Sequence, residues 1–241
     1  MNWPDGYGFA RHQELDSTNE EARRLAQDGA QGPVWISAAR QTSGRGRQGR
    51  VWQSLPGNLS ATLLIRPSRP DREWPQLSFA AAIAAADMVA GFAPHANIAV
   101  KWPNDVLADG KKLAGILLER VGGADGSLAI GIGVNLAHHP DGTEFPAISL
   151  PVLGASPPSP DQSLTALAAH FAKWYDQWQA QGFAALREAW LARAAGLGAT
   201  IRARLAQEER VGVFEGIDDS GALLLNEGGR ISAISAGEVF L

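Results

Sequence analysis

Four short strand-like segments follow one another closely in the middle of the chain, and they constrain its fold more than any other feature. They comprise residues 98–101, 105–108, 113–121 and 128–136. The dipeptides Asp109-Gly110 and Asp125-Gly126 lie between neighbouring segments, and Asp-Gly is a preferred sequence for a tight hairpin turn. Because strands joined by tight turns pair in opposite directions, the sequence predicts an antiparallel sheet.

Helical patterns and two further strands surround this sheet. Ser17 followed by Glu20 fits a capping box, so the first element is predicted to be a helix that begins at Ser17 and ends before Gly29. Strands are predicted at 34–39 and 58–65, and helices at 74–89 and 183–194. A further helix is predicted along a stripe of large apolar residues. The stripe comprises Leu164, Leu167, Phe171, Trp174, Tyr175 and Trp178. The predicted class is α+β, with a mixed or antiparallel sheet and packing helices.

The last part of the chain differs from the rest, because residues 200–241 contain only short strand patterns. Turn sequences separate them, such as Asp218-Asp219-Ser220-Gly221. A length of 241 residues suits one medium domain and one small domain, since about 150 residues per domain is a soft expectation. We predict a larger domain over residues 1–195 and a small barrel-like domain over residues 196–241.

The composition excludes several classes of function. The chain has no Cys, which excludes disulfides, thiolate catalysis and cysteine metal sites. Its formal net charge of −4 has the wrong sign for a protein that mainly grips nucleic acid, so no DNA partner is expected. There is no run of roughly 18 apolar residues, and no basic segment followed by an apolar one at the start. We therefore expect a cytoplasmic protein without a membrane partner.

Cations are concentrated in one acid-free stretch. Between Gly29 and Pro70 there is no Asp, Glu, Lys or His, but there are six arginines: Arg40, Arg45, Arg47, Arg50, Arg66 and Arg69. Three of them lie in a glycine-rich loop, where forked guanidinium donors suit phosphate and carboxylate groups. Residues 41–50 include no large apolar side chain, so we expect the loop to be mobile until an anion orders it. A solvated surface loop is the alternative.

The loop sequence Gly44-Arg45-Gly46-Arg47-Gln48-Gly49 matches the G-x-G-x-x-G pattern of dinucleotide-binding proteins. A dinucleotide-binding turn must open a helix, however, and Pro56-Gly57 follows too soon for one. The protein-kinase glycine-rich loop is excluded too, because neither H-R-D nor D-F-G follows. Both matches are therefore accidental.

A second polar cluster is predicted at Lys101-Trp102-Pro103-Asn104-Asp105, a corner between two strands. Lys111 and Lys112 begin the next strand, where one of them must point toward the sheet face that the other avoids. A lysine near Asp105 would balance charge on a transferring phosphoryl group. The alternative is that these lysines are simply solvated.

Taken in order, these motifs resemble those of the biotin protein ligases. The motifs are Asp16-Ser17-Thr18-Asn19, Gln41 with the loop from Gly44 to Arg50 and Trp52, Lys101 to Asp105, Lys112-Leu113-Ala114-Gly115, and Gly131-Ile132-Gly133-Val134-Asn135. Five motifs in one order are strongly specific. The resemblance implies a class II synthetase-like catalytic domain that binds biotin and ATP, followed by a small C-terminal SH3-like β-barrel.

The resemblance implies a reaction in two steps. Biotin and ATP give biotinyl-5′-AMP and pyrophosphate, and a lysine of a biotin carboxyl carrier protein, such as that of acetyl-CoA carboxylase, then takes the biotin. ATP and biotin are substrates, and Mg²⁺ is expected with Asp105 as its partner. A homodimer is left open. Only fifteen residues precede Asp16, too few for the helix-turn-helix domain of some members, so a ligase-only form is expected.

The resemblance also assigns roles to residues. Catalytic roles fall to Lys112, Arg45 and Asp105. Biotin contacts fall to Ser17, Thr18, Asn19, Gln41, Gly44, Arg45, Gly46, Arg47 and Lys112. Contacts with ATP or the adenylate fall to Arg47, Arg50, Trp52, Lys101, Asn104 and Asn135. Gln48 stands where many members carry Arg, so one guanidinium is missing from the loop.

Two alternatives remain. A lipoate-protein ligase shares the fold type, but it is not expected to carry both the Gly-Arg-rich loop and the Lys101 to Asp105 motif. A nucleic-acid-binding module would use Arg45, Arg47 and Arg50 with Trp52 as a stacking platform. The net charge of −4 speaks against that module.

Overall fold

The computed structural model describes residues 1–123 and 126–241. Its larger part is a seven-stranded sheet in the order β1-β2-β3-β7-β6-β5-β4. The strands are β1 (Gly8–Leu15), β2 (Val34–Gln41), β3 (Leu59–Ile65), β4 (Ile98–Lys101), β5 (Asp105–Ala108), β6 (Lys111–Val121) and β7 (Ser127–Val134). Pairing is antiparallel except between β1 and β2, which run parallel. The predicted antiparallel sheet of β4 to β7 is confirmed, although Asp125 of the second predicted turn lies outside the described residues.

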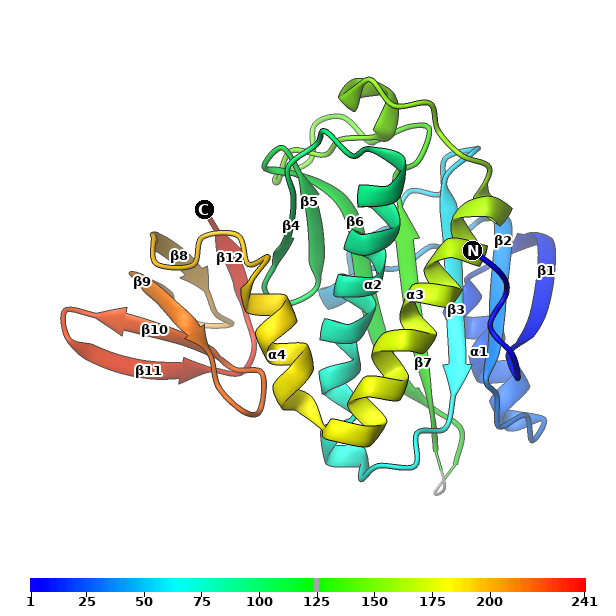
Figure 1. The fold of residues 1–241 in the computed structure, drawn as a ribbon, viewed down its shortest axis with the longest axis horizontal. Helices are drawn as coiled ribbons and strands as arrows, with labels where there is room; N and C mark the ends of the chain where they lie inside the picture. The colour runs from blue at the N-terminus through cyan, green and yellow to red at the C-terminus, as the bar shows by residue number, and fades with distance from the viewer. Residues whose placement is uncertain (124–125) are drawn as a thin grey trace.

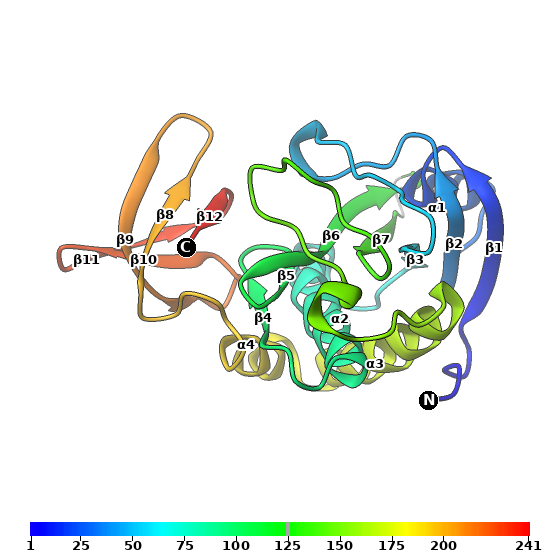
Figure 2. The same ribbon diagram turned by 90° about the horizontal axis from the view of Figure 1, so that it is seen from above.

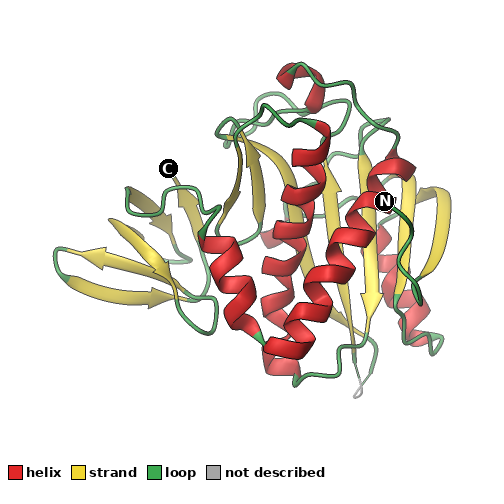
Figure 3. Cartoon of the chain, in the orientation of Figure 1, coloured by secondary structure: helices red, strands yellow, loops and turns green. Residues whose placement is uncertain are grey.

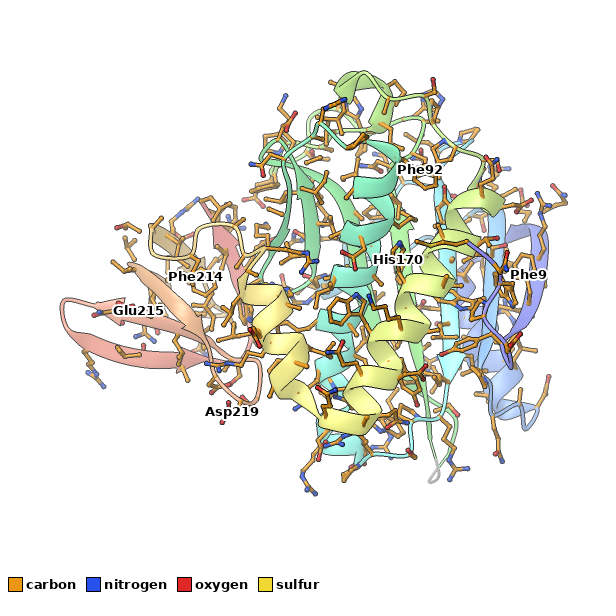
Figure 4. The ribbon with its side chains drawn as sticks, viewed as in Figure 1. Phe9, Phe92, His170, Phe214, Glu215 and Asp219 are labelled. Carbon is orange, nitrogen blue, oxygen red and sulfur yellow. The ribbon has the colours of Figure 1, made fainter. Side chains whose placement is uncertain are left out.

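The prediction that the chain begins with a helix is wrong, because β1 precedes it. Strand β1 is the outermost strand and reads GFARHQEL, with no run of apolar residues. An edge strand of this kind buries little side-chain surface and so leaves no strong hydrophobic pattern. Phe9 on β1 is 46% exposed and lies at the edge of the sheet that β1 forms (Figure 4).

Helices cover both faces of the sheet (Figures 1 and 2). Helices α2 (Leu77–Phe92) and α3 (Pro160–Gln181) lie on one face, and α1 (Thr18–Gln27) lies on the other. The main core fills the space under α2 and α3, and a smaller apolar cluster around Ala22 and Ile36 lies under α1. This arrangement leaves the sheet beside the first turn of α1 free to form a site.

The central helix begins later than predicted. Residues Asp71–Gln76 form a 3₁₀ turn, η2, that contains Pro75, and the α-helix runs from Leu77 past Gly91 to Phe92. Its alanines are buried from several sides, which lets α3 pack closely against it. The segment 71–92 is long and apolar enough to cross a membrane, yet 61% of its most apolar stretch is buried within the fold.

Polar contacts join α2, α3 and Arg193, which follows the adjacent helix α4 (Phe183–Leu191). Asp87 on α2 accepts hydrogen bonds from the Trp174 indole at 2.8 Å and from Arg193 at 3.1 Å. His170, also on α3, lies 4.0 Å from the same carboxylate (Figure 4). The predicted apolar stripe is confirmed as core, because Leu164, Leu167, Phe171, Trp174 and Trp178 are buried and Tyr175 is half-buried against them.

The C-terminal part is a separate five-stranded antiparallel sheet in the order β11-β10-β9-β8-β12 (Figure 3). The strands are β8 (Thr200–Arg204), β9 (Glu209–Ile217), β10 (Leu223–Glu227), β11 (Arg230–Ile234) and β12 (Glu238–Phe240). In the described part of the chain, β11 and β12 are its two edges, so it is an open form of the predicted barrel. Phe214 on β9 packs edge-on against Trp190 of α4 with centroids 6.4 Å apart.

Two hydrogen bonds bring this sheet to the corner between β4 and β5. The buried Trp102 indole donates to the carbonyl of Gly221 at 3.0 Å, and Lys101 Nζ donates to the carbonyl of Val239 at 3.2 Å. Strand β12 therefore lies beside the motif that the sequence singled out at this corner.

Candidate functional site

A pocket of about 280 Å³ opens on the sheet face that carries α1. Nearly all of the predicted site residues line it. They are Ser17, Thr18, Asn19, Gln41, Arg45, Gly46, Arg47, Arg50, Trp52, Lys101, Asn104, Asp105, Lys112 and Asn135. The exception is Gly44, at the start of the loop, where a Cβ would come within 2.4 Å of the Trp52 carbonyl oxygen. The fold thus brings together residues that are up to 118 positions apart, the interval from Ser17 to Asn135.

One end of the pocket is formed by the first turn of α1. The Ser17 hydroxyl caps this helix by accepting from the backbone N–H of Asn19 at 3.3 Å. The predicted capping box is wrong in its second half, because Glu20 pairs with Arg45 instead of turning back to Ser17. Gln41 at the end of β2 accepts from the backbone N–H of Thr18 at 2.8 Å. The α1 start and the end of β2 are thereby held side by side.

The glycine–arginine loop contains only a single 3₁₀ turn, η1 (Arg47–Gly49), which agrees with the exclusion of a dinucleotide-binding helix. Gln48 lies in the left-handed region with a φ of 56°, and Gly49 follows with a φ of 74°. A left-handed residue is costly for a side chain other than Gly, Asn or Asp. The tight turn directs Arg47 and Arg50 toward the C-terminal sheet.

The loop makes polar contacts to distant parts of the chain without an anion, and its expected mobility stays a prediction. Arg45 lies 3.1 Å from Glu119 on β6 and also pairs with Glu20. Arg47 donates to the Asn104 side chain at 3.1 Å. Arg50 makes two hydrogen bonds to Glu238 on β12, at 2.5 and 2.7 Å. The acidic partners come from distant elements, which is why the composition of the loop alone did not indicate them.

Two lysines face one carboxylate in the middle of the pocket. Asp105 lies 2.6 Å from Lys112 Nζ and 3.2 Å from Lys101 Nζ. Lys101 is only 2% exposed, and its burial lowers its pKa, an effect that the nearby Asp105 opposes. Of the two neighbouring lysines on β6, Lys112 points into the pocket whereas Lys111 is exposed, as predicted.

Trp52 lies flat against two glycines of the sheet. A Cβ on Gly133 would lie 2.3 Å from the indole, and one on Gly115 would lie 3.3 Å from it. Any larger residue at 133 would therefore displace the ring. Asn104 and Asn135, which the resemblance assigns to ATP contacts, donate hydrogen bonds to backbone carbonyls. Asn104 donates to Ile116 at 2.6 Å and Asn135 donates to Lys112 at 3.5 Å.

Several residues that line the site or hold its side chains were missed by the sequence analysis. Thr62 is fully buried on β3 and lies 2.8 Å from the Thr18 hydroxyl and 2.6 Å from the Asn19 side chain. Glu119, Glu20 and Glu238 hold the loop arginines, and Glu119 also accepts from Asn19 at 2.8 Å. Thr62, Glu119 and Glu238 lie in no recognisable motif, and Glu20 was noted only for the predicted capping box. The one available signal was the absence of acids in the arginine-rich stretch, which implied partners elsewhere.

Comparisons with known proteins agree with this site. Residues 11–136 match the model of the Biotin/lipoate A/B protein ligase family, and residues 196–241 match the Biotin protein ligase C terminal domain. A biotin--[acetyl-CoA-carboxylase] ligase of Paracoccus denitrificans is 47% identical, covering 93% of this chain and 97% of that protein. One of Mycobacterium tuberculosis is 35% identical, covering 92% and 85%.

A solved structure supports the same assignment. The biotin protein ligase of Aquifex aeolicus in complex with biotin and ATP superposes with a TM-score of 0.84, at 25% identity, and the match covers 97% of each chain. The fold, the site and the extent of these matches agree, and the chain belongs to the biotin/lipoate A/B protein ligase family.

Proposed function

We propose that this chain is an ATP-dependent biotin protein ligase that forms biotinyl-5′-AMP and transfers the biotin to a carrier lysine. The observation that carries the proposal is that one pocket joins the α1 turn, the arginine loop, Trp52 and the Lys112–Asp105 pair. Two relatives that match over most of both chains are named as ligases of this kind, which supports it.

In the first step, the carboxylate oxygen of biotin attacks the α-phosphorus of ATP, and the bond to the bridging oxygen breaks to release pyrophosphate. Negative charge builds up around this phosphorus in the transition state. Lys112 is the cation placed to stabilise that charge, and Asp105 at 2.6 Å holds its ammonium group in position. Arg45 is assigned to the carboxylate, and Arg47 and Arg50 to the phosphates.

In the second step, the neutral amine of the carrier lysine attacks the carbonyl carbon of the mixed anhydride. An amide forms, AMP leaves with the bonding electrons and the amine proton is released. We propose that the carrier is the biotin carboxyl carrier protein of acetyl-CoA carboxylase, as the names of the relatives suggest. A closed loop over the pocket would keep water from the anhydride until the lysine arrives.

Magnesium at Asp105 fits the resting site poorly. Each oxygen of this carboxylate faces a lysine ammonium group, and no group of three or more acidic or His residues that would hold a metal occurs in residues 1–123 and 126–241. Mg²⁺ in nucleotide sites is usually held by one or two carboxylates together with substrate phosphates. Mg²⁺ bound to the phosphates of ATP stays a prediction.

We further propose that the enzyme acts in the cytoplasm without DNA or membrane partners. The net charge of −4 supports the absence of a DNA partner. Light scattering of the purified protein would establish whether it forms a homodimer.

The experiment that tests the proposed function is exchange of labelled pyrophosphate into ATP. We expect exchange that depends on biotin and does not occur with lipoate, followed by labelling of an apo carrier domain. Equal exchange with lipoate would favour the lipoate ligase, and no exchange with either acid would refute adenylate formation.

A further inference from the structure

A chain of hydrogen bonds runs beneath the biotin end of the pocket, from Glu119 on β6 to Thr18 at the start of α1. Glu119 Oε2 accepts from Asn19 Nδ2 at 2.8 Å. Asn19 Oδ1 lies 2.6 Å from the Thr62 hydroxyl, which lies 2.8 Å from the Thr18 hydroxyl. Three elements, β6, β3 and α1, are thus joined by side-chain hydrogen bonds.

The close packing of this chain leaves it little freedom to rearrange. Thr62 is 0% exposed, and Asn19 lies directly over Gly131 on β7. A Cβ at Gly131 would come within 2.4 Å of Asn19 Oδ1, so glycine is required there for Asn19 to take this position. The hydrogen bonds are therefore formed by side chains held in single positions.

The direction of each hydrogen bond follows from Glu119, because a carboxylate can only accept. Asn19 must present its amide N–H to Glu119, and its oxygen must then face Thr62. The Thr62 hydroxyl is the donor toward both this oxygen and the Thr18 hydroxyl, which share its proton. A flipped Asn19 amide would place its oxygen against the Glu119 carboxylate.

The Thr18 hydroxyl accepts from Thr62 at 2.8 Å and donates its own proton to Gln41 Oε1 at 3.1 Å. Gln41 Oε1 also accepts from the Thr18 backbone N–H at 2.8 Å. The Thr18 hydroxyl is therefore left as an acceptor at the pocket. The Gln41 amide is left with its NH₂ group as a donor.

We propose that Glu119 and Thr62 are positioning residues that set the hydrogen-bond polarity of the biotin end of the pocket. An acceptor beside a donor matches the N–H and C=O groups of the cyclic urea of biotin. The dithiolane ring of lipoate offers neither group, so the same polarity disfavours lipoate. This inference rests on the proposed function and goes further, because it assigns the selectivity to two residues outside the predicted motifs.

Calorimetric titration with biotin tests the proposal on the full chain. Thr62→Val keeps the shape of the side chain but removes the hydroxyl, and we expect biotin binding to weaken about tenfold, or about 1.4 kcal/mol. Thr62→Ser restores the hydroxyl and should bind within about twofold of the wild type, since a twofold change is well under 1 kcal/mol. The Kd for ATP should change by less than about twofold in both variants.

Ser163→Ala is the matched control, because it removes a fully buried hydroxyl in α3 whose partner is the Ser159 carbonyl. It should bind biotin as the wild type does. Glu119→Gln can present either its oxygen or its NH₂ group to Asn19 and should also weaken biotin about tenfold. Since both changes interrupt one chain, the double variant should lose about tenfold rather than about a hundredfold.

The outcomes separate the two proposals. If the wild type does not bind biotin, the proposed function fails. If the wild type binds biotin but Thr62→Val binds it equally well, or if the two losses add fully, the inference about polarity fails alone. If Thr62→Val does not fold, Thr62→Ser and Glu119→Gln still test the proposal, and tight binding by Glu119→Gln would overturn it.

Discussion

Lys112 Nζ lies 2.6 Å from Asp105 Oδ1, and this ion pair joins the strand β6 to the corner between β4 and β5. The carboxylate is buried and is shared with Lys101 on its other oxygen. Two cations around one carboxylate leave a net positive charge at this point of the pocket. A phosphoryl group that gains negative charge in the reaction is stabilised by such a fixed charge.

Replacing Lys112 by Met should therefore affect chemistry more than folding. We expect adenylate formation to fall by about 10²- to 10³-fold, as is typical when one preorganised donor is removed. Asp105 keeps Lys101 as a partner, so the melting temperature should change little. Pyrophosphate exchange measures the loss, and Lys111→Met is the control because this exposed neighbour lies outside the pocket. Near-normal exchange by Lys112→Met would show that Lys112 has no catalytic role.

Much of the fold could be predicted because its signals are local. Turn dipeptides and apolar runs indicated the antiparallel strands β4 to β7, and helical spacing indicated α3. The first strand could not be predicted in this way, because β1 is stabilised by pairing with β2 rather than by its own buried side chains. Pairing between edge strands depends on tertiary context that a single sequence does not contain.

The site was predictable only where the motif residues themselves face the pocket. Ser17, Trp52 and Lys112 belong to recognisable motifs, whereas Thr62 and Glu238 do not. Thr62 contacts Asn19 across 43 positions, and Glu238 contacts Arg50 across 188. These partners are selected by the three-dimensional arrangement of β3 and β12. The sequence pattern around each is that of an ordinary strand.

The adenine of ATP is expected to stack on the Trp52 indole. Trp52→Ala should weaken ATP binding much more than biotin binding, because stacking of one base on an aromatic ring is worth about 1 to 3 kcal/mol in single-strand binders. Gly133→Ala should have a similar effect, since the added Cβ would lie 2.3 Å from the ring. Calorimetric titration with ATP and with biotin separately distinguishes a loss of ATP binding from a loss of biotin binding.

Gly91→Ala is the control for the glycine change, because no atom lies within 4 Å of the position of its added Cβ. It should leave both Kd values unchanged. A variant Trp52→Ala that loses biotin and keeps ATP would show that the adenine lies elsewhere.

The ion pair between Asp16 and Arg24 makes stability depend on pH in the acid range. Arg24 donates to both oxygens of Asp16, at 3.0 and 2.7 Å, and these hydrogen bonds lower the pKa of Asp16 from 3.8 to about 2. A carboxyl with a lowered pKa stabilises the folded state above 3.8, and this contribution is lost as the pH falls toward about 2.

Asp16→Asn should therefore be less stable than the wild type at neutral pH, and the difference should shrink between pH 3.8 and about 2. Both side chains are nearly half exposed, so the effect should be modest and reduced by salt. Urea denaturation at several pH values measures it. A difference that stays constant across this range would mean that the Asp16 charge does not contribute.

The arginine loop is held by ion pairs, so its opening should depend on salt. Arg45 and Arg50 are each more than a third exposed, and pairs of this kind are screened as ionic strength rises. Trypsin cleaves after Arg45, Arg47 and Arg50 when the loop is open. We expect slow cleavage at low salt, faster cleavage at high salt, and protection by biotin with ATP, whose anionic groups replace the acidic partners.

Glu238→Gln isolates the anchor on β12, because it removes the charge that Arg50 contacts at 2.5 and 2.7 Å. Cleavage of this variant should already be fast at low salt, while cleavage of a small peptide substrate corrects for the effect of salt on trypsin itself. Ligand should still protect the variant, since the proposed role of these arginines is to contact the phosphates directly. Cleavage that is independent of salt, of Glu238 and of ligand would show that the loop does not close over the pocket, and the role of Arg47 and Arg50 in holding phosphates would then be refuted.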